Sequence, residues 1–116
     1  MLKVINIKEN LPDTEYAVFQ MSREIYFAKK ENINVLVVIH GYGSNGVGGA
    51  IKKAVKDELT QLKSKKEIID FSPGEQFGEM SELKSTLNKL YPETILNDHM
   101  QNLNSGITIV WVLKWF

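Results

Sequence analysis

The sequence predicts an α/β domain, a two-layer sandwich whose mixed four-stranded sheet is built around a βαβαβ core. Short β-branched runs alternate with longer segments in which apolar residues recur every three or four positions, the pattern of strands joined by helices. A glycine-rich segment separates one such strand from the helix that follows it. The 116 residues suit a single domain, residues 1–116, because two independent cores need a longer chain.

The first strand and the first helix come from the beginning of the chain. Residues 2–7 are rich in β-branched side chains and end in a polar turn, which predicts a strand. A helix is expected over residues 13–30, with Asn10 or Asp13 as its cap. Phe19 and Tyr26 lie seven residues apart, on one side of this helix, and are expected at the edge of the core. Its apolar face is formed by Val18, Met21, Ile25 and Ala28.

The middle of the chain completes the βαβαβ pattern. Residues 33–39 form an unbroken apolar run, which predicts a central strand covered on both faces. Five glycines follow within residues 41–49, and a second amphipathic helix over residues 51–62 comes after them. Residues 67–71 are expected to form the third strand.

The last third of the chain reads as an insertion followed by a strand. Residues 72–104 contain several turn signals and one short helix, which ends at Tyr91 and Pro92. Residues 107–113 are strongly apolar and predict the final strand, with Trp111 inside it and Trp115 close to the terminus. A helical insertion before the last strand is therefore expected.

Composition excludes several classes of protein. Fourteen basic and fourteen acidic side chains give a net charge of zero, so bulk positive charge cannot drive binding to nucleic acid. The absence of cysteine excludes disulfides, thiolate metal sites and a cysteine nucleophile. No apolar run is long enough to span a membrane and no signal peptide is recognisable, so a cytoplasmic protein without a membrane partner is expected.

The glycine-rich loop and the helix after it favour an anion site. Amides at a helix amino terminus lack helical partners, and the helix dipole is positive there. Lysines in the first turns are unfavourable unless an anion compensates them. Residues 41–66 hold six lysines and two acids, a net charge of +4, whereas residues 67–116 hold three lysines and seven acids, a net charge of −4. The alternative is a flexible connection before a helix with a solvated polar face.

Three known loop types fit the same glycines less well. Gly41-x-Gly43-x-x-Gly46 matches the dinucleotide fingerprint, with Asp70 as the ribose-binding acid, but the chain has room for about one mononucleotide-binding half. The loop also looks like the oxyanion loop of α/β-hydrolases, yet no G-x-S-x-G motif occurs. A phosphate loop with a Gly-Lys pair is excluded because no such pair exists.

Two stretches together resemble the small MutS-related domain, called Smr. They are Val-Val-Ile-His40-Gly41-Tyr42-Gly43-Ser44 and Gly48-Gly49-Ala50-Ile51-x-x-Ala54-Val55. The resemblance covers residues 2–71 and 105–113, and it implies a stand-alone member of a family of DNA- or RNA-binding domains, several of which are nicking endonucleases. The implied partner is therefore DNA or RNA.

The first strand departs from the family, which commonly has L-D-x-H where this chain has Ile5-Asn6-Ile7-Lys8. Asn6 cannot act as a general base, and Lys8 can pair with phosphate but cannot replace an imidazole. Nicking would then depend on His40 as the candidate catalytic residue, and a structural role in the strand end is the alternative. The candidate phosphate-binding residues are Lys8, Gly41, Tyr42, Gly43, Ser44, Gly46, Gly48, Gly49, Lys52, Lys53 and Lys56.

Two further possibilities stay open at this point. No cofactor is indicated. Oxygen and nitrogen ligands for a divalent metal exist, but their spacing in the sequence defines no metal site. These residues are Asp70, Glu75, Glu79, Asp98 and His99. Tyr42 could stack on an unpaired base or pack on the helix. The alternative to nucleic-acid binding is an inactive interaction or regulatory module whose apolar end, Trp115 and Phe116, docks a partner.

Overall fold

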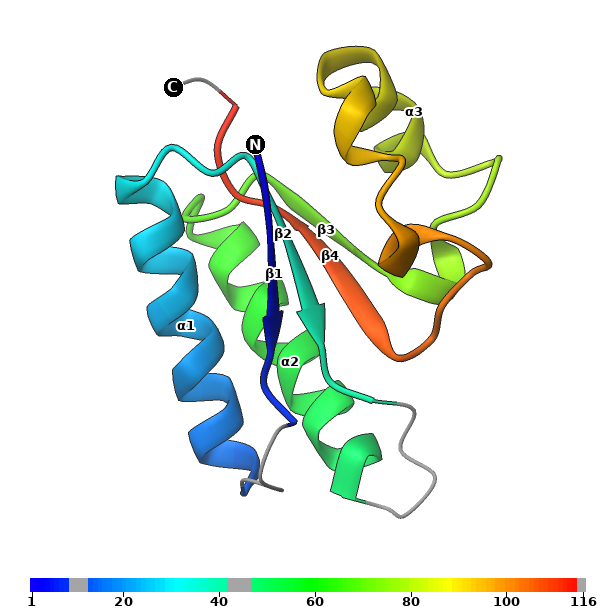
Figure 1. Cartoon of the computed structure of the whole chain (residues 1–116). Helices are drawn as coiled ribbons and strands as arrows, with labels where there is room; N and C mark the ends of the chain where they lie inside the picture. The colour runs from blue at the N-terminus through cyan, green and yellow to red at the C-terminus, as the bar shows by residue number, and fades with distance from the viewer. Residues whose placement is uncertain (9–12, 42–46, 115–116) are drawn as a thin grey trace.

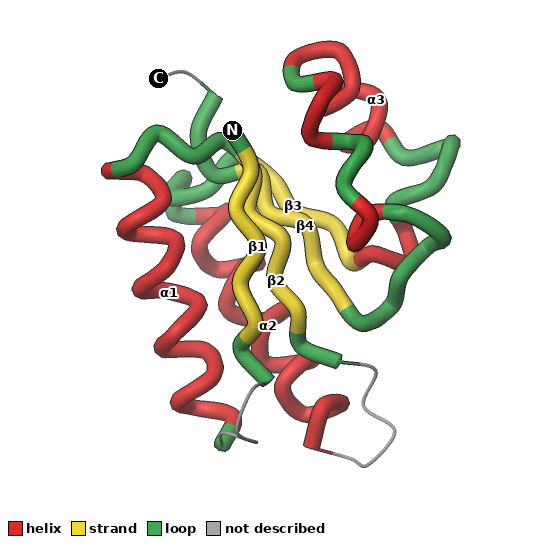
Figure 2. The backbone as a smooth tube through the Cα atoms, in the orientation of Figure 1, coloured by secondary structure: helices red, strands yellow, loops and turns green. Residues whose placement is uncertain are grey.

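A mixed sheet of four strands forms the centre of the computed structural model, which describes residues 1–8, 13–41 and 47–114. β1 (Leu2–Asn6) and β2 (Val35–Ile39) are parallel neighbours. β4 (Ile107–Trp111) runs antiparallel to both β2 and β3 (Asp70–Pro73), so the order is β1-β2-β4-β3 (Figure 2). The α/β fold with a mixed four-stranded sheet is confirmed.

Two long helices cover one face of the sheet (Figure 1). They are α1 (Thr14–Lys30) and α2 (Val47–Ser64), which also contact each other. Alternate residues of the strands point toward them, as the period of two requires. Buried side chains that join the helices to the sheet include Met21, Ile25, Leu36, Val38, Val55, Leu59 and Val110.

The insertion covers the opposite face of the same sheet. It contains the helix α3 (Glu82–Leu90) and three single 3₁₀ turns, η1 (Gly74–Gln76), η2 (Pro92–Thr94) and η3 (Asp98–Met100). Its buried apolar side chains pack against the other set of alternate strand residues: Phe77, Leu83, Leu87 and Met100 against Val35, Val37, Ile107 and Ile109. The apolar run of β2 is thus covered on both faces, as predicted.

The boundaries of α1 agree with the sequence, but the position of its aromatic residues does not. Asp13 caps the helix, because its Oδ1 accepts from the amide of Tyr16 at 2.8 Å. The buried face consists of Ala17, Met21, Ile25 and Ala28. The expectation that Phe19 and Tyr26 lie at the core edge is wrong, since they are 59% and 53% exposed and lie on the side of α1 that faces away from the sheet.

Two other elements are shifted along the chain. α2 begins at Val47, four residues before its predicted start, and ends at Ser64. β3 begins at Asp70 rather than residue 67. The reason is the end of α2, where Lys66 has a φ of 62° and the amide of Glu67 donates back to Leu62 O. Residues 67–69, which the sequence pattern assigned to the strand, therefore form part of the turn that ends α2.

Candidate functional site

Lys8 and Gly41 meet where the parallel strands β1 and β2 end. Gly41 has a φ of 84°, and a Cβ atom on it would lie 3.2 Å from Cδ of Lys8. The amide of Lys8 donates to Oδ1 of Asn6 at 3.0 Å, which turns the chain after β1. Lys8 is exposed, so the structure brings an accessible cation to the start of the glycine-rich loop.

The amides of His40 and Gly41 are already used within the fold. Both donate to the carbonyl oxygen of Gly106 at 3.0 Å, just before β4. Gly41 therefore cannot offer its amide to a phosphate, which corrects its assignment as a phosphate donor. Its positive φ is the feature that requires glycine here, because the chain turns while its amide stays bonded to Gly106.

His40 is fully buried, and both of its ring nitrogens have partners. Nδ1 lies 2.9 Å from Gly41 O and Nε2 lies 2.9 Å from Thr108 Oγ1. A neutral ring that donates from Nδ1 and accepts the Thr108 hydroxyl at Nε2 satisfies every group. Burial lowers the pKa of His40 below its ordinary value, against the opposing effect of the Gly41 carbonyl. The sequence left two roles open for His40, catalytic and structural, and this geometry favours the structural one.

Lys52 is held by neighbours rather than presented to a ligand. Its Nζ lies 2.5 Å from Oε2 of Glu75 and donates to Ser105 O at 3.0 Å. Partial burial acts to raise the pKa of Glu75, but the hydrogen bond from Lys52, the backbone hydrogen bond at Glu75 and the positive charge of Lys52 together outweigh it and hold that pKa below its usual range. The assignment of Lys52 as a free phosphate ligand is corrected, because an acid from η1 already neutralises it.

Lys53 and Lys56 keep their charge exposed on α2. Neither makes an ion pair with any residue that the structure describes. Gly49 is exposed in the first turn of the same helix, which holds no acid, and Gly48 precedes it. Figure 1 shows the start of α2 at the same end of the molecule as the ends of β1 and β2. Tyr42, Gly43, Ser44 and Gly46 lie outside the described residues.

The basic segment (residues 41–66) and the acidic segment (residues 67–116) pack against each other, so ion pairs neutralise part of their opposite charges. Lys63 lies 2.9 Å from Asp70, and Lys52 pairs with Glu75, so two cations of the basic segment meet two acids of the acidic segment. Both pairs lie along the border between α2 and the β3–η1 segment. Within residues 1–8, 13–41 and 47–114, the remaining positive charge near the loop comes from Lys8, Lys53 and Lys56.

A groove of about 200 Å³ lies beside Asn6, between β1 and α1. The groove carries both signs of charge, because Arg23 and Glu24 also line it. Glu24 Oε2 lies 3.1 Å from Lys3 Nζ, and this contact raises the pKa of the Lys3 ammonium. The groove thus offers an amide and an ion pair instead of a free carboxylate.

The residues considered as metal ligands are spread over the fold. Asp70 and Glu75 are bonded to lysines, and Asp98 and His99 lie in η3 on the exposed surface. Within residues 1–8, 13–41 and 47–114, no three His, Asp or Glu side chains come close enough to hold one metal ion. Glu79 is exposed in the loop before α3.

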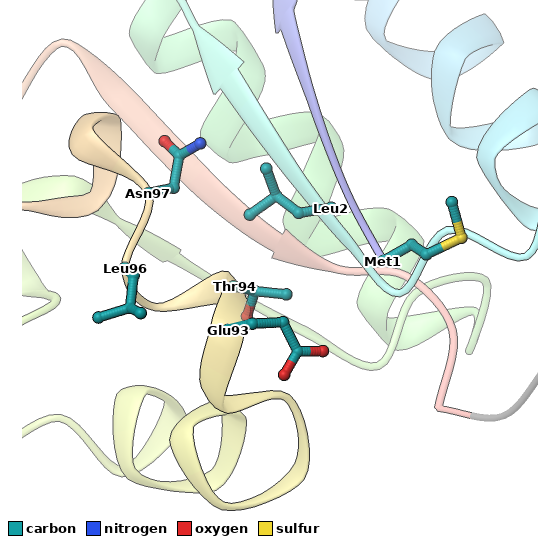
Figure 3. A pocket seen from close by; sticks show the side chains of 6 residues that line it. All are labelled: Met1, Leu2, Glu93, Thr94, Leu96 and Asn97. Atoms are coloured by element: carbon teal, nitrogen blue, oxygen red, sulfur yellow. The ribbon is translucent and has the colours of Figure 1, made fainter.

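A larger cavity lies at the other end of the sheet. Its volume is about 390 Å³, and it is lined by Met1, Leu2, Glu93, Thr94, Leu96 and Asn97 (Figure 3). Figure 3 shows side chains from the start of β1 facing those of the η2 segment. Three of these six side chains are polar, Glu93, Thr94 and Asn97, and Glu93 is the ionisable one.

Sequence reasoning missed an exposed group of aromatic side chains on α1. Tyr16, Phe19, Tyr26 and Phe27 are between 44% and 59% exposed. We call them the aromatic stripe. The spacings of three residues from Tyr16 to Phe19 and seven from Phe19 to Tyr26 were available in the sequence, and Phe27 lies roughly 100° further round the helix from Tyr26; which face of α1 meets the sheet was not available.

Comparisons with known proteins leave the family open. No family model matches the chain, and no curated protein or solved structure matches it. Among the described residues, no helix is long and apolar enough to cross a membrane.

Proposed function

We propose that the chain is a nucleic-acid-binding domain of the Smr kind that holds the phosphate backbone at the carboxyl ends of β1 and β2. The contacts come from Lys8, from the amides of the glycine-rich loop and the first turn of α2, and from Lys53 and Lys56. His40 and Gly41 shape the strand end that carries the loop. The substrate class is single- or double-stranded DNA or RNA.

One observation carries the proposal. A lysine just after β1 lies against the first glycine of a loop that leads into α2, whose exposed Lys53 and Lys56 lie in its second and third turns with no acid before Asp57. Helix amino termini bind anions through unpartnered amides and the positive end of the dipole. Because the dipole effect is confined to the first turn, Lys53 and Lys56 add positive charge along α2 without opposing the dipole.

Binding rather than cleavage is the function that this geometry supports. His40 is buried with both ring nitrogens bonded, and Asn6 replaces the acid that a nuclease of this type would use. Nicking of supercoiled plasmid with magnesium or manganese, scored beside binding, tests this part separately. Nicking that disappears in a His40→Gln variant whose circular dichroism shows the native fold would contradict a purely structural role of His40.

Few free cations imply weak, salt-sensitive binding. Each phosphate neutralised on double-stranded DNA adds about 0.9 to the slope of log affinity against log salt. We expect Lys53→Ala with Lys56→Ala to lower that slope by about two, measured by fluorescence anisotropy with labelled oligonucleotides. The matched control, Lys65→Ala with Lys89→Ala, removes the same charge from exposed positions away from the loop and should leave the slope nearly unchanged.

Glu75→Gln supplies the opposite change in the same assay. It removes the acid that neutralises Lys52 and leaves the lysine in place. We expect tighter binding and a steeper salt slope than in the wild type, because one more cation becomes available. Equal slopes in the wild type, the Lys53/Lys56 variant and Glu75→Gln would contradict the proposed site.

The second hypothesis, an inactive interaction module, receives support from a different part of the molecule. Trp115 and Phe116, the docking residues that the sequence suggested, lie outside the described residues. The aromatic stripe on α1 is an exposed apolar surface of the kind that marks protein contacts.

A further inference from the structure

The aromatic stripe is apolar surface that the fold itself does not use. Phe19 and Tyr26 lie on the side of α1 that faces away from the sheet, and both are more than half exposed. Apolar residues scattered singly over a surface are ordinary, but several aromatic rings along one helix are not. The exposed large hydrophobic side chains of α1 are all aromatic, so this surface consists of flat rings.

Basic side chains alternate with two of these rings. Phe19, Arg23, Tyr26 and Lys30 follow one another at spacings of four, three and four residues, which places them on one face of the helix. Lys30 Nζ lies 4.7 Å from the centre of the Tyr26 ring. Neither Arg23 nor Lys30 makes an ion pair within residues 1–8, 13–41 and 47–114. We call these four residues the ring–cation face.

The acids closest to this face in the chain do not cancel its charge. Glu24 and Glu31 pair with Lys3 of β1, at 3.1 and 3.6 Å. Glu15 is exposed but lies about one turn before Phe19, where the positive stretch ends. The ring–cation face is therefore complementary in charge to an anionic partner.

We propose that the ring–cation face binds single-stranded nucleic acid, with bases stacked on Phe19 and Tyr26 and phosphates paired with Arg23 and Lys30. This inference rests on the proposed function and names single strands as its substrate. Aromatic rings stack on unpaired bases of any sequence, whereas the bases of a duplex stack on one another and leave no free ring face. Phe19 and Tyr26 are about 10 Å apart along the helix axis, or roughly three base steps of about 3.4 Å.

The ring–cation face lies close to the proposed phosphate site. Arg23 also lines the groove beside Asn6, the last residue of β1, and Lys8 follows two residues later. Figure 1 shows α1 beginning at the same end of the molecule as α2. A strand held at the glycine-rich loop can therefore continue along α1. An acidic peptide or an anionic membrane matches the charge, but a strand of unpaired bases also uses the flat faces of the rings.

A comparison of single and double strands tests the proposal. Fluorescence anisotropy of the full chain with labelled oligothymidine, and with a duplex of the same length, gives the two affinities. Phe19→Ser with Tyr26→Ser should weaken binding to the single strand by at least about tenfold and leave binding to the duplex unchanged. The matched control, Met80→Ser with Leu96→Ser, removes two exposed apolar side chains of the insertion and should change neither affinity.

A strand without bases tests the stacking itself. An oligonucleotide of abasic sites keeps the sugars and phosphates of oligothymidine. We expect the wild type to bind it about tenfold more weakly than oligothymidine, and the Phe19/Tyr26 variant to bind the two strands about equally. A loss in this variant that is equal on both strands would overturn the proposal, because the rings would then not contact bases.

The two cations have a separate readout. Each phosphate neutralised on a single strand adds about 0.7 to the slope of log affinity against log salt. Arg23→Ala with Lys30→Ala should therefore lower the slope on oligothymidine by about 1.4 and leave the slope on the duplex unchanged. An unchanged slope on oligothymidine would overturn the assignment of these two side chains.

Failure of this inference can be told apart from failure of the proposed function. If Lys53→Ala with Lys56→Ala weakens binding to both kinds of strand and the Phe19/Tyr26 variant matches the wild type, this inference is overturned and the proposed function stands. If the wild type binds no oligonucleotide at low salt, both are overturned. Binding to phosphatidylserine vesicles or to polyglutamate that depends on Phe19, with single-strand binding unaffected, would also overturn this inference.

Discussion

His40 shows how one side chain can resemble a catalytic group and serve as a structural one. A histidine beside a glycine-rich loop is a natural candidate for phosphate chemistry, because its ordinary pKa lies near neutrality. In the fold it closes the end of β2 by linking the Gly41 carbonyl to Thr108 on β4. Since those groups are otherwise buried, the ring is needed to satisfy them.

Replacing His40 should therefore reduce stability. We expect His40→Ala to lower the free energy of unfolding by about 2–4 kcal/mol, through a cavity and two lost hydrogen bonds. Urea denaturation measures the change, with His99→Ala as the control, because His99 is exposed. A loss below about 1 kcal/mol would contradict the structural role.

The same residue gives stability a defined dependence on pH. Because burial lowers the pKa of His40 in the fold, the unfolded chain binds the extra proton more readily below about pH 6.5. The contribution of His40 is thus fully present above pH 6.5 and is lost as the pH falls toward its lowered pKa. The difference in stability between wild type and His40→Ala should shrink over that range, and a constant difference would contradict this assignment.

At the scale of elements, the sequence predicts the secondary structure well and the contacts between elements poorly. Residues 13–30 and the helix before Tyr91 are found at almost their predicted positions, because caps and apolar spacing are local signals. The pairing of Lys52 with Glu75 joins residues 23 apart in the sequence, and its bond to Ser105 joins residues 53 apart. A local sequence pattern cannot show contacts between such distant residues. The sequence analysis therefore predicted more unpaired positive charge on α2 than the structure shows.

The junction of η1 and β4 depends on a glycine for close approach. A Cβ atom on Gly74 would collide with the backbone carbonyl of Asn104 and come within 2.8 Å of Ile107 Cγ1. We expect Gly74→Ala to lower the free energy of unfolding by about 2–4 kcal/mol, since the backbone must move. Thermal denaturation measures the loss.

Gly78→Ala is the matched control for that substitution. Its added methyl would meet only Cδ2 of Leu103, at 3.2 Å, and this side chain is half exposed and able to shift. We therefore expect a change within about 1 kcal/mol for Gly78→Ala. Equal effects of the two substitutions would mean that the η1–β4 contact is not as close as described.

At the scale of the whole molecule, two surfaces emerge that composition conceals. The net charge is zero, yet Lys8, Lys53 and Lys56 make no ion pair with the part of the chain that the structure describes, while Lys52 and Lys63 are neutralised by acids. The sequence shows the positions of the aromatic residues along α1. Only the packing of α1 on the sheet shows that their side chains are exposed to solvent. The glycine motif could be recognised from sequence, whereas the burial of its histidine could not.

The measurement that tests the central claim most directly is an amide NMR titration of the labelled protein with short DNA and RNA oligonucleotides at low salt. The account predicts shifts concentrated at Lys8, Gly49, Lys53 and Lys56 that weaken as salt is added. Amides of α3 and of the cavity beside Glu93 should stay unchanged. An absence of shifts at low salt, or shifts confined to surfaces away from the ends of β1 and β2, would contradict the account.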